Sequence, residues 1–113
     1  MTEARTFRVR LETPEGPRTI ECRQDEFVWD AAARSGVTLP AICHQGRCLT
    51  CAGRLIEGDV DLSRADAYFP QDRTAGFILL CRALPQSDLI IKTHEESAMR
   101  RHRLLQGLPA PYA

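Results

Sequence analysis

Hydrophobic and polar residues alternate near the start of the chain. Phe7, Val9 and Leu11 are separated by charged residues, a period-two pattern typical of a strand with one buried face. The run Pro14-Glu15-Gly16-Pro17 predicts a turn, and residues 19–23 predict the returning strand. We therefore expect an N-terminal hairpin.

A helical pattern follows the hairpin. Val28, Ala31 and Ala32 recur at helical spacing, which predicts a helix with one apolar face. Asp25 is placed to cap its N-terminus, and Gly36 is placed to end it. This is the main helix that the sequence predicts.

Three later segments predict strands: residues 52–60, which end at a Glu57-Gly58-Asp59 turn, the apolar run 77–82, and residues 89–92. Ser63-Arg64-Ala65-Asp66 and Thr93-His94-Glu95-Glu96 both match a capping box, so each predicts the start of a short helix. Strands and helices mix without regular alternation, which favours an α+β fold with a mixed sheet packed on one main helix.

The end of the chain has a different character. Residues 100–103 are all basic, and Pro109 and Pro111 lie close to the C-terminus. A cluster of like charges followed by prolines is typical of a solvated end. We expect a loosely attached, basic tail.

Composition and charge narrow the class of protein. The chain has 113 residues, of which 27% are charged and 43% hydrophobic, as in a globular domain. Its formal net charge of zero argues against nucleic-acid binding. No apolar run is long enough to span a membrane, and the N-terminus lacks the pattern of a secretory signal. We expect a cytoplasmic protein, in which thiols stay reduced.

The cysteines carry the candidate chemistry. Cys43, Cys48 and Cys51 form C-x4-C-x2-C, and Cys81 lies at the end of a predicted strand. This is the plant-type spacing for a 2Fe-2S cluster: one loop can wrap three thiolates around the cluster while a distant strand supplies the fourth. Cys22, by contrast, is expected to pack in the core as a small hydrophobe.

Other uses of the cysteines are possible. A structural zinc site usually takes two C-x2-C-like pairs, and only one such pair occurs here. A Rieske centre needs two histidine ligands, and His44 directly follows Cys43, which is a poor position for one. A disulfide framework would leave one of the five cysteines over. Zinc is the main alternative to the cluster.

The chain resembles the plant- and cyanobacterial-type 2Fe-2S ferredoxins over about residues 5–99. The resemblance is carried by Asp30-Ala31-Ala32, Leu39-Pro40, Cys43-x4-Cys48-x2-Cys51-Ala52-Gly53, Gly58-Asp59-Val60-Asp61, Ala75-Gly76-Phe77-Ile78-Leu79-Leu80-Cys81, Pro85-x-Ser87-Asp88 and Thr93-His94. It implies a β-grasp fold for a ferredoxin domain at 1–99, followed by the tail at 100–113. It also implies one 2Fe-2S cluster, ligated by the four cysteines.

The resemblance implies a one-electron carrier rather than an enzyme. Such a protein shuttles electrons between a ferredoxin reductase or photosystem I and acceptor enzymes, at a low potential near about −400 mV. We expect a monomer with redox proteins as partners. Two alternatives stay open: a dedicated electron-transfer subunit of one enzyme complex, and a zinc-stabilised binding module.

The loop around the first three ligands departs from the family pattern. Ile42, His44, Gln45 and Leu49 replace residues that are usual in the family. An aliphatic side chain cannot donate a hydrogen bond to a cluster sulfur, so Leu49 is expected to alter the potential. The residues expected to surround the cluster are Ile42, His44, Gln45, Gly46, Arg47, Leu49 and Thr50.

The expected partner surface departs further. Photosynthetic members have a run of acidic residues where this chain has Phe69-Pro70-Gln71, with Tyr68 close by. Glu96 matches a family glutamate used to dock a reductase, and Glu95 precedes it. Glu95, Glu96, Tyr68 and Phe69 are therefore the expected partner-binding residues.

Overall fold

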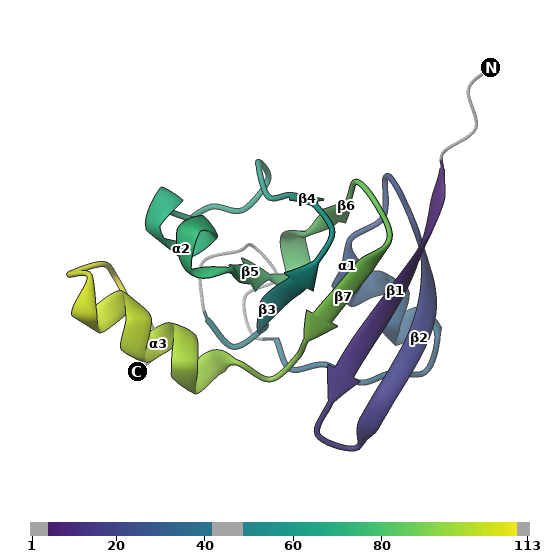
Figure 1. Ribbon diagram of the computed structural model, residues 1–113, viewed down its shortest axis with the longest axis horizontal. Coiled ribbons are helices and arrows are strands. Elements are labelled where there is room, and N and C mark those ends of the chain that lie inside the picture. The colour runs from purple at the N-terminus through teal and green to yellow at the C-terminus, as the bar shows by residue number, and fades with distance from the viewer. Residues whose placement is uncertain (1–4, 42–48, 111–113) are drawn as a thin grey trace.

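The N-terminal hairpin forms as its alternating pattern predicts. In the computed structural model, which describes residues 5–41 and 49–110, β1 (Thr6–Thr13) pairs antiparallel with β2 (Gly16–Arg23) (Figure 1). Phe7, Val9 and Leu11 are buried, while the residues between them face solvent or lie at the margin of the core. The hairpin prediction is confirmed.

The hairpin is one edge of a mixed sheet. The strand order is β2-β1-β7-β3-β5, in which β1 and β7 run parallel and the other neighbours run antiparallel (Figure 1). A second, two-stranded sheet joins β4 and β6. The bounds are β3 (Ala52–Glu57), β4 (Val60–Asp61), β5 (Phe77–Leu79), β6 (Leu84–Pro85) and β7 (Leu89–Lys92).

The main helix begins later than the sequence predicts. Helix α1 (Val28–Arg34) starts after Phe27, and no side chain caps it, so the prediction of Asp25 as N-cap was wrong. The amide of Val28 instead donates to the carbonyl of Ala83, 2.9 Å away, and this distant partner satisfies the helix start. Gly36, with φ of 83°, ends the helix as predicted.

The first capping-box prediction was also wrong. No helix begins at Ser63, because the Asp61 carboxylate accepts the Ser63 amide and fixes a turn there. Helix α2 (Pro70–Ala75) begins seven positions later, with the carboxylate of Asp72 accepting the amide of Phe69 at 2.9 Å. The apolar run at 77–82 divides into β5 and the short 3-10 helix η1 (Leu80–Arg82).

The last helix confirms one expectation and corrects another. Helix α3 (Glu96–Leu105) forms where a helix is predicted, but Thr93 bonds the carbonyl of Glu12 and the ring of His94 instead of capping it. The expectation of a loosely attached tail was wrong for α3, because Met99 and Arg103 on this helix are fully buried. The helix continues without a break from residue 99 to residue 100, so the predicted boundary between domain and tail falls inside it. That boundary stays a prediction.

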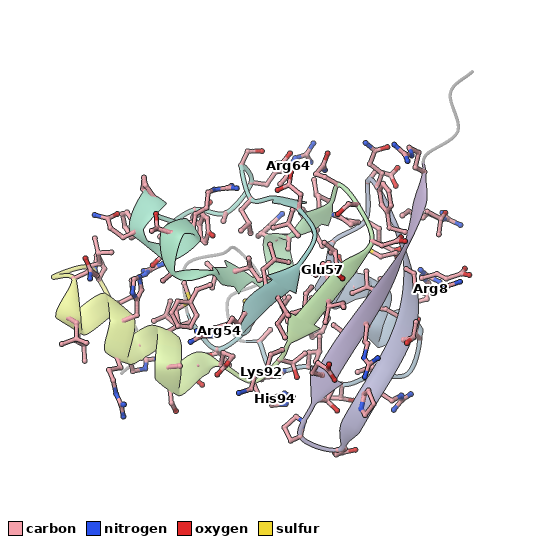
Figure 2. All side chains as sticks on the ribbon, in the orientation of Figure 1. Arg8, Arg54, Glu57, Arg64, Lys92 and His94 are labelled. Atoms are coloured by element: carbon pink, nitrogen blue, oxygen red, sulfur yellow. The ribbon has the colours of Figure 1, made fainter. Side chains whose placement is uncertain are left out.

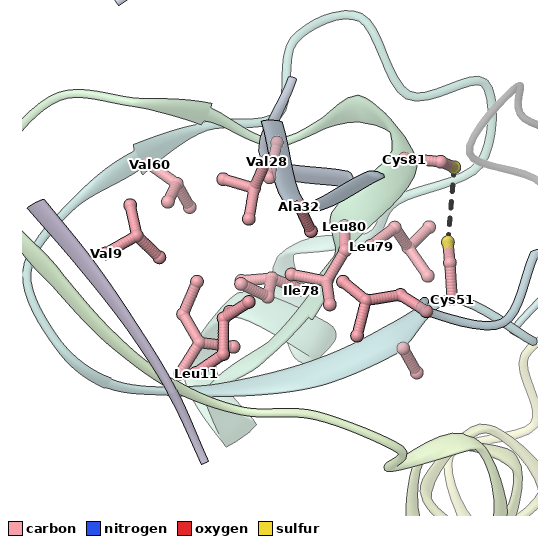
Figure 3. Packing of buried hydrophobic residues seen from close by; sticks show 14 of the residues in the cluster. Val9, Leu11, Val28, Ala32, Cys51, Val60, Ile78, Leu79, Leu80 and Cys81 are labelled. Carbon is pink, nitrogen blue, oxygen red and sulfur yellow. Dashed lines mark hydrogen bonds between the residues drawn. The ribbon is translucent and has the colours of Figure 1, made fainter. Parts of the chain in front are cut away.

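The core lies between the sheet and α1. Val9, Leu11, Val28, Ile78 and Leu80 meet there (Figure 3). Cys22 is fully buried in the same core, as expected, and Trp29 packs against this core. Among the described residues, no helix is long and apolar enough to cross a membrane.

Candidate metal centre

Two of the predicted ligands meet at one end of the sheet. The antiparallel register of β3 and β5 pairs Ala52 with Leu79, so Cys51 just before β3 lies beside Cys81 just after β5. The amide of Leu80 donates to the carbonyl of Cys51, and the two Sγ atoms lie 3.1 Å apart (Figure 3). Residues thirty positions apart in the sequence thus form one thiol pair.

The pair has the chemistry of a metal site. A separation of 3.1 Å is well beyond the ~2.05 Å of a disulfide. Two thiolates on one tetrahedral metal, at ~2.3 Å each, lie roughly 3.8 Å apart. A small rotation of either side chain would therefore let both bind one metal ion. Both cysteines are buried, which restricts the access of water to their sulfur atoms. A buried thiolate is better stabilised by a bound metal than left without one.

The residues next to Cys51 also fit a cluster. Leu49 is fully buried and offers no hydrogen-bond donor. The hydroxyl of Thr50 is buried and finds no hydrogen-bond partner in the described part of the chain. A buried hydroxyl of this kind is costly unless it is hydrogen-bonded, and a cluster or cysteine sulfur would accept a hydrogen bond from it.

The remaining predicted site residues lie outside the described residues. They are the ligands Cys43 and Cys48 and the neighbouring residues Ile42, His44, Gln45, Gly46 and Arg47. Among the residues that the structure describes, no group of three or more His, Cys, Asp or Glu side chains could hold a metal ion. The described half of the site is thus the pair Cys51 and Cys81.

Gly53 lies where two strands approach closely. A Cβ at this position would lie 3.1 Å from both the Ile91 side chain and the carbonyl of Lys92. The close approach of β7 to β3 therefore explains the glycine.

The expected aromatic partner residues are engaged within the chain. The half-buried Tyr68 donates its hydroxyl to the carbonyl of Phe77 at 2.5 Å, and burial raises its pKa to about 12. The ring of Phe69 lies 4.8 Å from the guanidinium carbon of Arg103. Both contacts fix the segment before α2.

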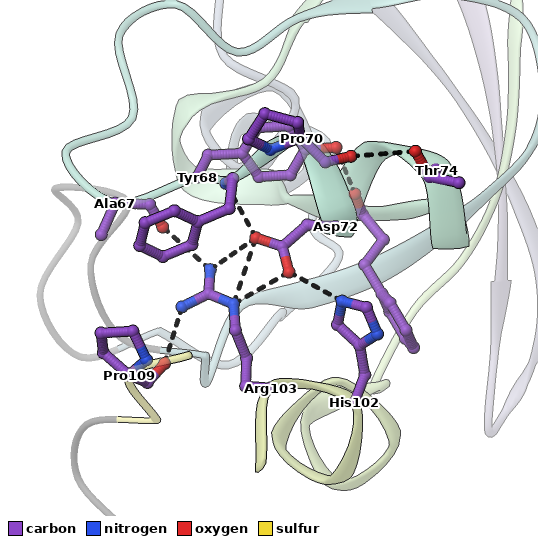
Figure 4. A network of polar contacts seen from close by, with 10 residues as sticks. Ala67, Tyr68, Pro70, Asp72, Thr74, His102, Arg103 and Pro109 are labelled. Atoms are coloured by element: carbon purple, nitrogen blue, oxygen red, sulfur yellow. Dashed lines mark hydrogen bonds and ion pairs between the residues drawn. The ribbon is translucent and has the colours of Figure 1, made fainter. Parts of the chain in front are cut away.

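A polar network that sequence patterns did not predict holds α3 to α2. Arg103 is fully buried, and its guanidinium donates to the equally buried carboxylate of Asp72 (Figure 4). The same guanidinium donates to the carbonyls of Ala67 and Pro109, each within 2.9 Å. His102 lies 3.0 Å from the Asp72 carboxylate. The only signal in the sequence was Arg103 sharing a helical face with Met99, four positions earlier.

Comparison with known proteins identifies the family. The sequence model described as "2Fe-2S iron-sulfur cluster binding domain" matches residues 12–86, about two thirds of the chain. This chain belongs to that family. It therefore has the β-grasp fold of the family, with the mixed sheet described above, and carries one 2Fe-2S cluster.

Curated relatives agree with this assignment. The heterocyst ferredoxin of Microchaete diplosiphon is 39% identical over 93 residues, covering 80% of this chain and 94% of that protein. The chloroplastic Ferredoxin-6 of Zea mays is 37% identical over 90 residues, covering 79% of this chain and 58% of that protein. The chain is a plant- and cyanobacterial-type ferredoxin domain that acts as an electron carrier.

Solved structures place the same domain in larger proteins. Pectocin M2 superposes with a TM-score of 0.75 at 31% identity, over 82% of this chain and 34% of its own. The Amycolatopsis cytochrome P450 reductase GcoB superposes with a TM-score of 0.70 at 31% identity, over 78% of this chain and 26% of its own. This chain thus spans about a third of the first protein and a quarter of the second.

Proposed function

We propose that Cys43, Cys48, Cys51 and Cys81 ligate the single 2Fe-2S cluster of this electron carrier. The observation that carries the proposal is the Cys51–Cys81 pair, which the β3–β5 register holds with the sulfurs 3.1 Å apart. The plant-type spacing of the other two cysteines supplies the rest of the ligand set.

The residues of the chain set the conditions under which the cluster works. When bound, the cluster accepts and returns one electron. Cys51 and Cys81 hold their end of it in a buried site, and Leu49 adds apolar surface there without a donor. The buried hydroxyl of Thr50 has no partner among the described residues, and a hydrogen bond from it to a sulfur would stabilise the reduced form. The protein itself forms and breaks no substrate bond.

The partner is proposed to be a reductase or an acceptor enzyme. A ferredoxin reductase in carbazole 1,9a-dioxygenase superposes with a TM-score of 0.69 at 27% identity, and GcoB is itself a reductase. These neighbours support electron exchange with reductase-type proteins, either as a free monomer or as a dedicated subunit. A low potential, a cytoplasmic location and exchange with photosystem I stay predictions.

Anaerobic spectroscopy tests the proposal. The purified protein should be red-brown, should bleach partly with dithionite, and should then give a low-temperature EPR signal of one unpaired spin. Cys51→Ser and Cys81→Ser should each lose or alter this signal, whereas Cys22→Ser, a core position, should keep it. A colourless protein with stoichiometric zinc after iron and sulfide reconstitution would contradict the proposal and favour the zinc-stabilised module.

A further inference from the structure

The two glutamates expected to dock partners are already paired within the chain. The Glu95 carboxylate lies 3.5 Å from the side chain of Arg54 and 3.6 Å from that of Lys92. Glu96 binds Arg100 at 2.9 Å, one helical turn further along α3. Neither glutamate therefore presents an uncompensated negative charge to a partner.

Cations are in excess on the same surface. Arg54 and Lys92 share one carboxylate, so one positive charge remains there, and both side chains are largely exposed (Figure 2). Arg101 is exposed on α3 and forms no ion pair with any residue that the structure describes. A charge in a surface ion pair still contributes to the electrostatic potential around it. The potential of this surface, summed over its cations and the two glutamates, is therefore positive.

The surface also offers apolar contact area on a fixed support. Leu104 and Leu105 are 68% and 78% exposed, and together with Arg101 they follow helical spacing on one side of α3. Arg103 on the opposite side is anchored to Asp72. A partner would therefore meet a preformed helix, which lowers the entropy lost on binding.

This surface lies next to the described half of the cluster site. The amide of Glu95, just before α3, donates to the carbonyl of Ala52 at 3.0 Å, and Ala52 directly follows Cys51. The N-terminal end of this surface, at Arg54 and Lys92, therefore lies close to the cluster site, and a protein docked over it comes near the cluster, as electron transfer requires.

We infer that the α3 surface, defined as Arg54, Lys92, Arg101, Leu104 and Leu105, docks an acidic redox protein. The inference rests on the proposed function. Exposed cations around apolar side chains complement a partner whose apolar contact patch is ringed by Asp and Glu. Weak, salt-sensitive encounters on this surface would suit a carrier that must release each partner quickly.

Charged inorganic oxidants provide the test. The reduced holoprotein is mixed with anionic hexacyanoferrate(III) or cationic hexaamminecobalt(III), and cluster oxidation is followed by absorbance. At about 10 mM ionic strength, Arg101→Glu should slow oxidation by the anion about fivefold and speed oxidation by the cation, and both effects should vanish near about 0.5 M salt. Arg18→Glu on the exposed part of β2 changes the net charge equally and should alter neither rate by more than about 1.5-fold.

A polypeptide probe extends the test to protein docking. Poly-L-glutamate should slow hexacyanoferrate oxidation of the wild type at low salt and should have little effect on Arg101→Glu combined with Lys92→Glu. Equal effects of Arg101→Glu and Arg18→Glu, or no slowing of the wild type by poly-L-glutamate, would overturn the inference. A sample with no reducible cluster would instead refute the proposed function, and its absorption spectrum shows this before any kinetics are measured.

Discussion

The buried guanidinium of Arg103 provides the sharpest test of how α3 is held. It makes three contacts with the Asp72 carboxylate and one each with the carbonyls of Ala67 and Pro109. Replacing Arg103 with Met keeps much of the apolar volume of the side chain and retains good helix propensity, but it removes every one of these donors. The exposed Arg101→Met on the same helix is the matched control.

The magnitude follows from what is left behind. In Arg103→Met, Asp72 stays fully buried and, among the described residues, keeps only the amide of Phe69 and the ring of His102 as partners. Removing one member of a buried ion pair costs about 3–5 kcal/mol. This loss of stability should mainly promote local unfolding of α3, because the other described polar contact between α3 and α2 is the one from His102 to Asp72. Since 1.4 kcal/mol corresponds to a tenfold change in an equilibrium constant, a loss of ~3 kcal/mol lowers the hydrogen-exchange protection of α3 amides roughly 100-fold.

Native-state hydrogen exchange of the holoprotein measures this locally. Amides of α3 should lose protection in Arg103→Met, while those of β1 and β7 should change far less. Arg101→Met should leave α3 protection within about threefold of wild type, since surface substitutions cost little. Unchanged protection of α3 in Arg103→Met would refute the reasoning and show that apolar packing around Met99 holds the helix by itself.

Other positions give further tests. Burial raises the pKa of the Cys22 thiol to about 12, so iodoacetamide at about pH 8 should leave Cys22 unmodified in the folded protein, and mass spectrometry detecting adduct there before unfolding would contradict this. Gly58→Ala should destabilise more than Gly16→Ala in thermal melts: both have positive φ, but only at Gly58 would a Cβ clash, 2.3 Å from the Asp88 carbonyl, so equal losses would count against the clash. The hydrogen bond from Arg34 lowers the pKa of Glu26 below its ordinary value of 4.5; its stabilisation is thus present above about pH 4.5 and lost as the pH falls through the folded pKa. Melting temperatures from circular dichroism should therefore drop less steeply with acid in Glu26→Gln, and parallel profiles would exclude this role.

Local patterns predicted much of the fold. The alternation of Phe7, Val9 and Leu11 predicted the hairpin because a strand turns successive side chains to opposite faces, whatever lies around it. Gly36 ended α1 as predicted, because few other residues adopt a positive φ without strain. The cysteine spacing predicted the cluster type because the order of ligands along the chain limits how a loop can wrap a cluster.

Two capping predictions failed because another group took the place of the predicted one, a local group at Ser63 and a distant group at α1. Ser63 begins no helix because Asp61 bonds its amide, and Val28 begins α1 because Ala83 accepts its amide. A sequence motif lists the groups that could bond locally, but it does not include partners that folding brings from elsewhere.

The sequence by itself determined the strand pattern, the main helix and the four candidate ligands, because these depend on neighbouring residues or on their order along the chain. Only the tertiary structure decided that Cys51 meets Cys81, through the β3–β5 register. It also decided that Arg103, a cation of the expected solvated tail, is buried against Asp72. A charge enters a protein interior only where an opposite charge and hydrogen-bond acceptors already converge, and that convergence is a property of the folded chain.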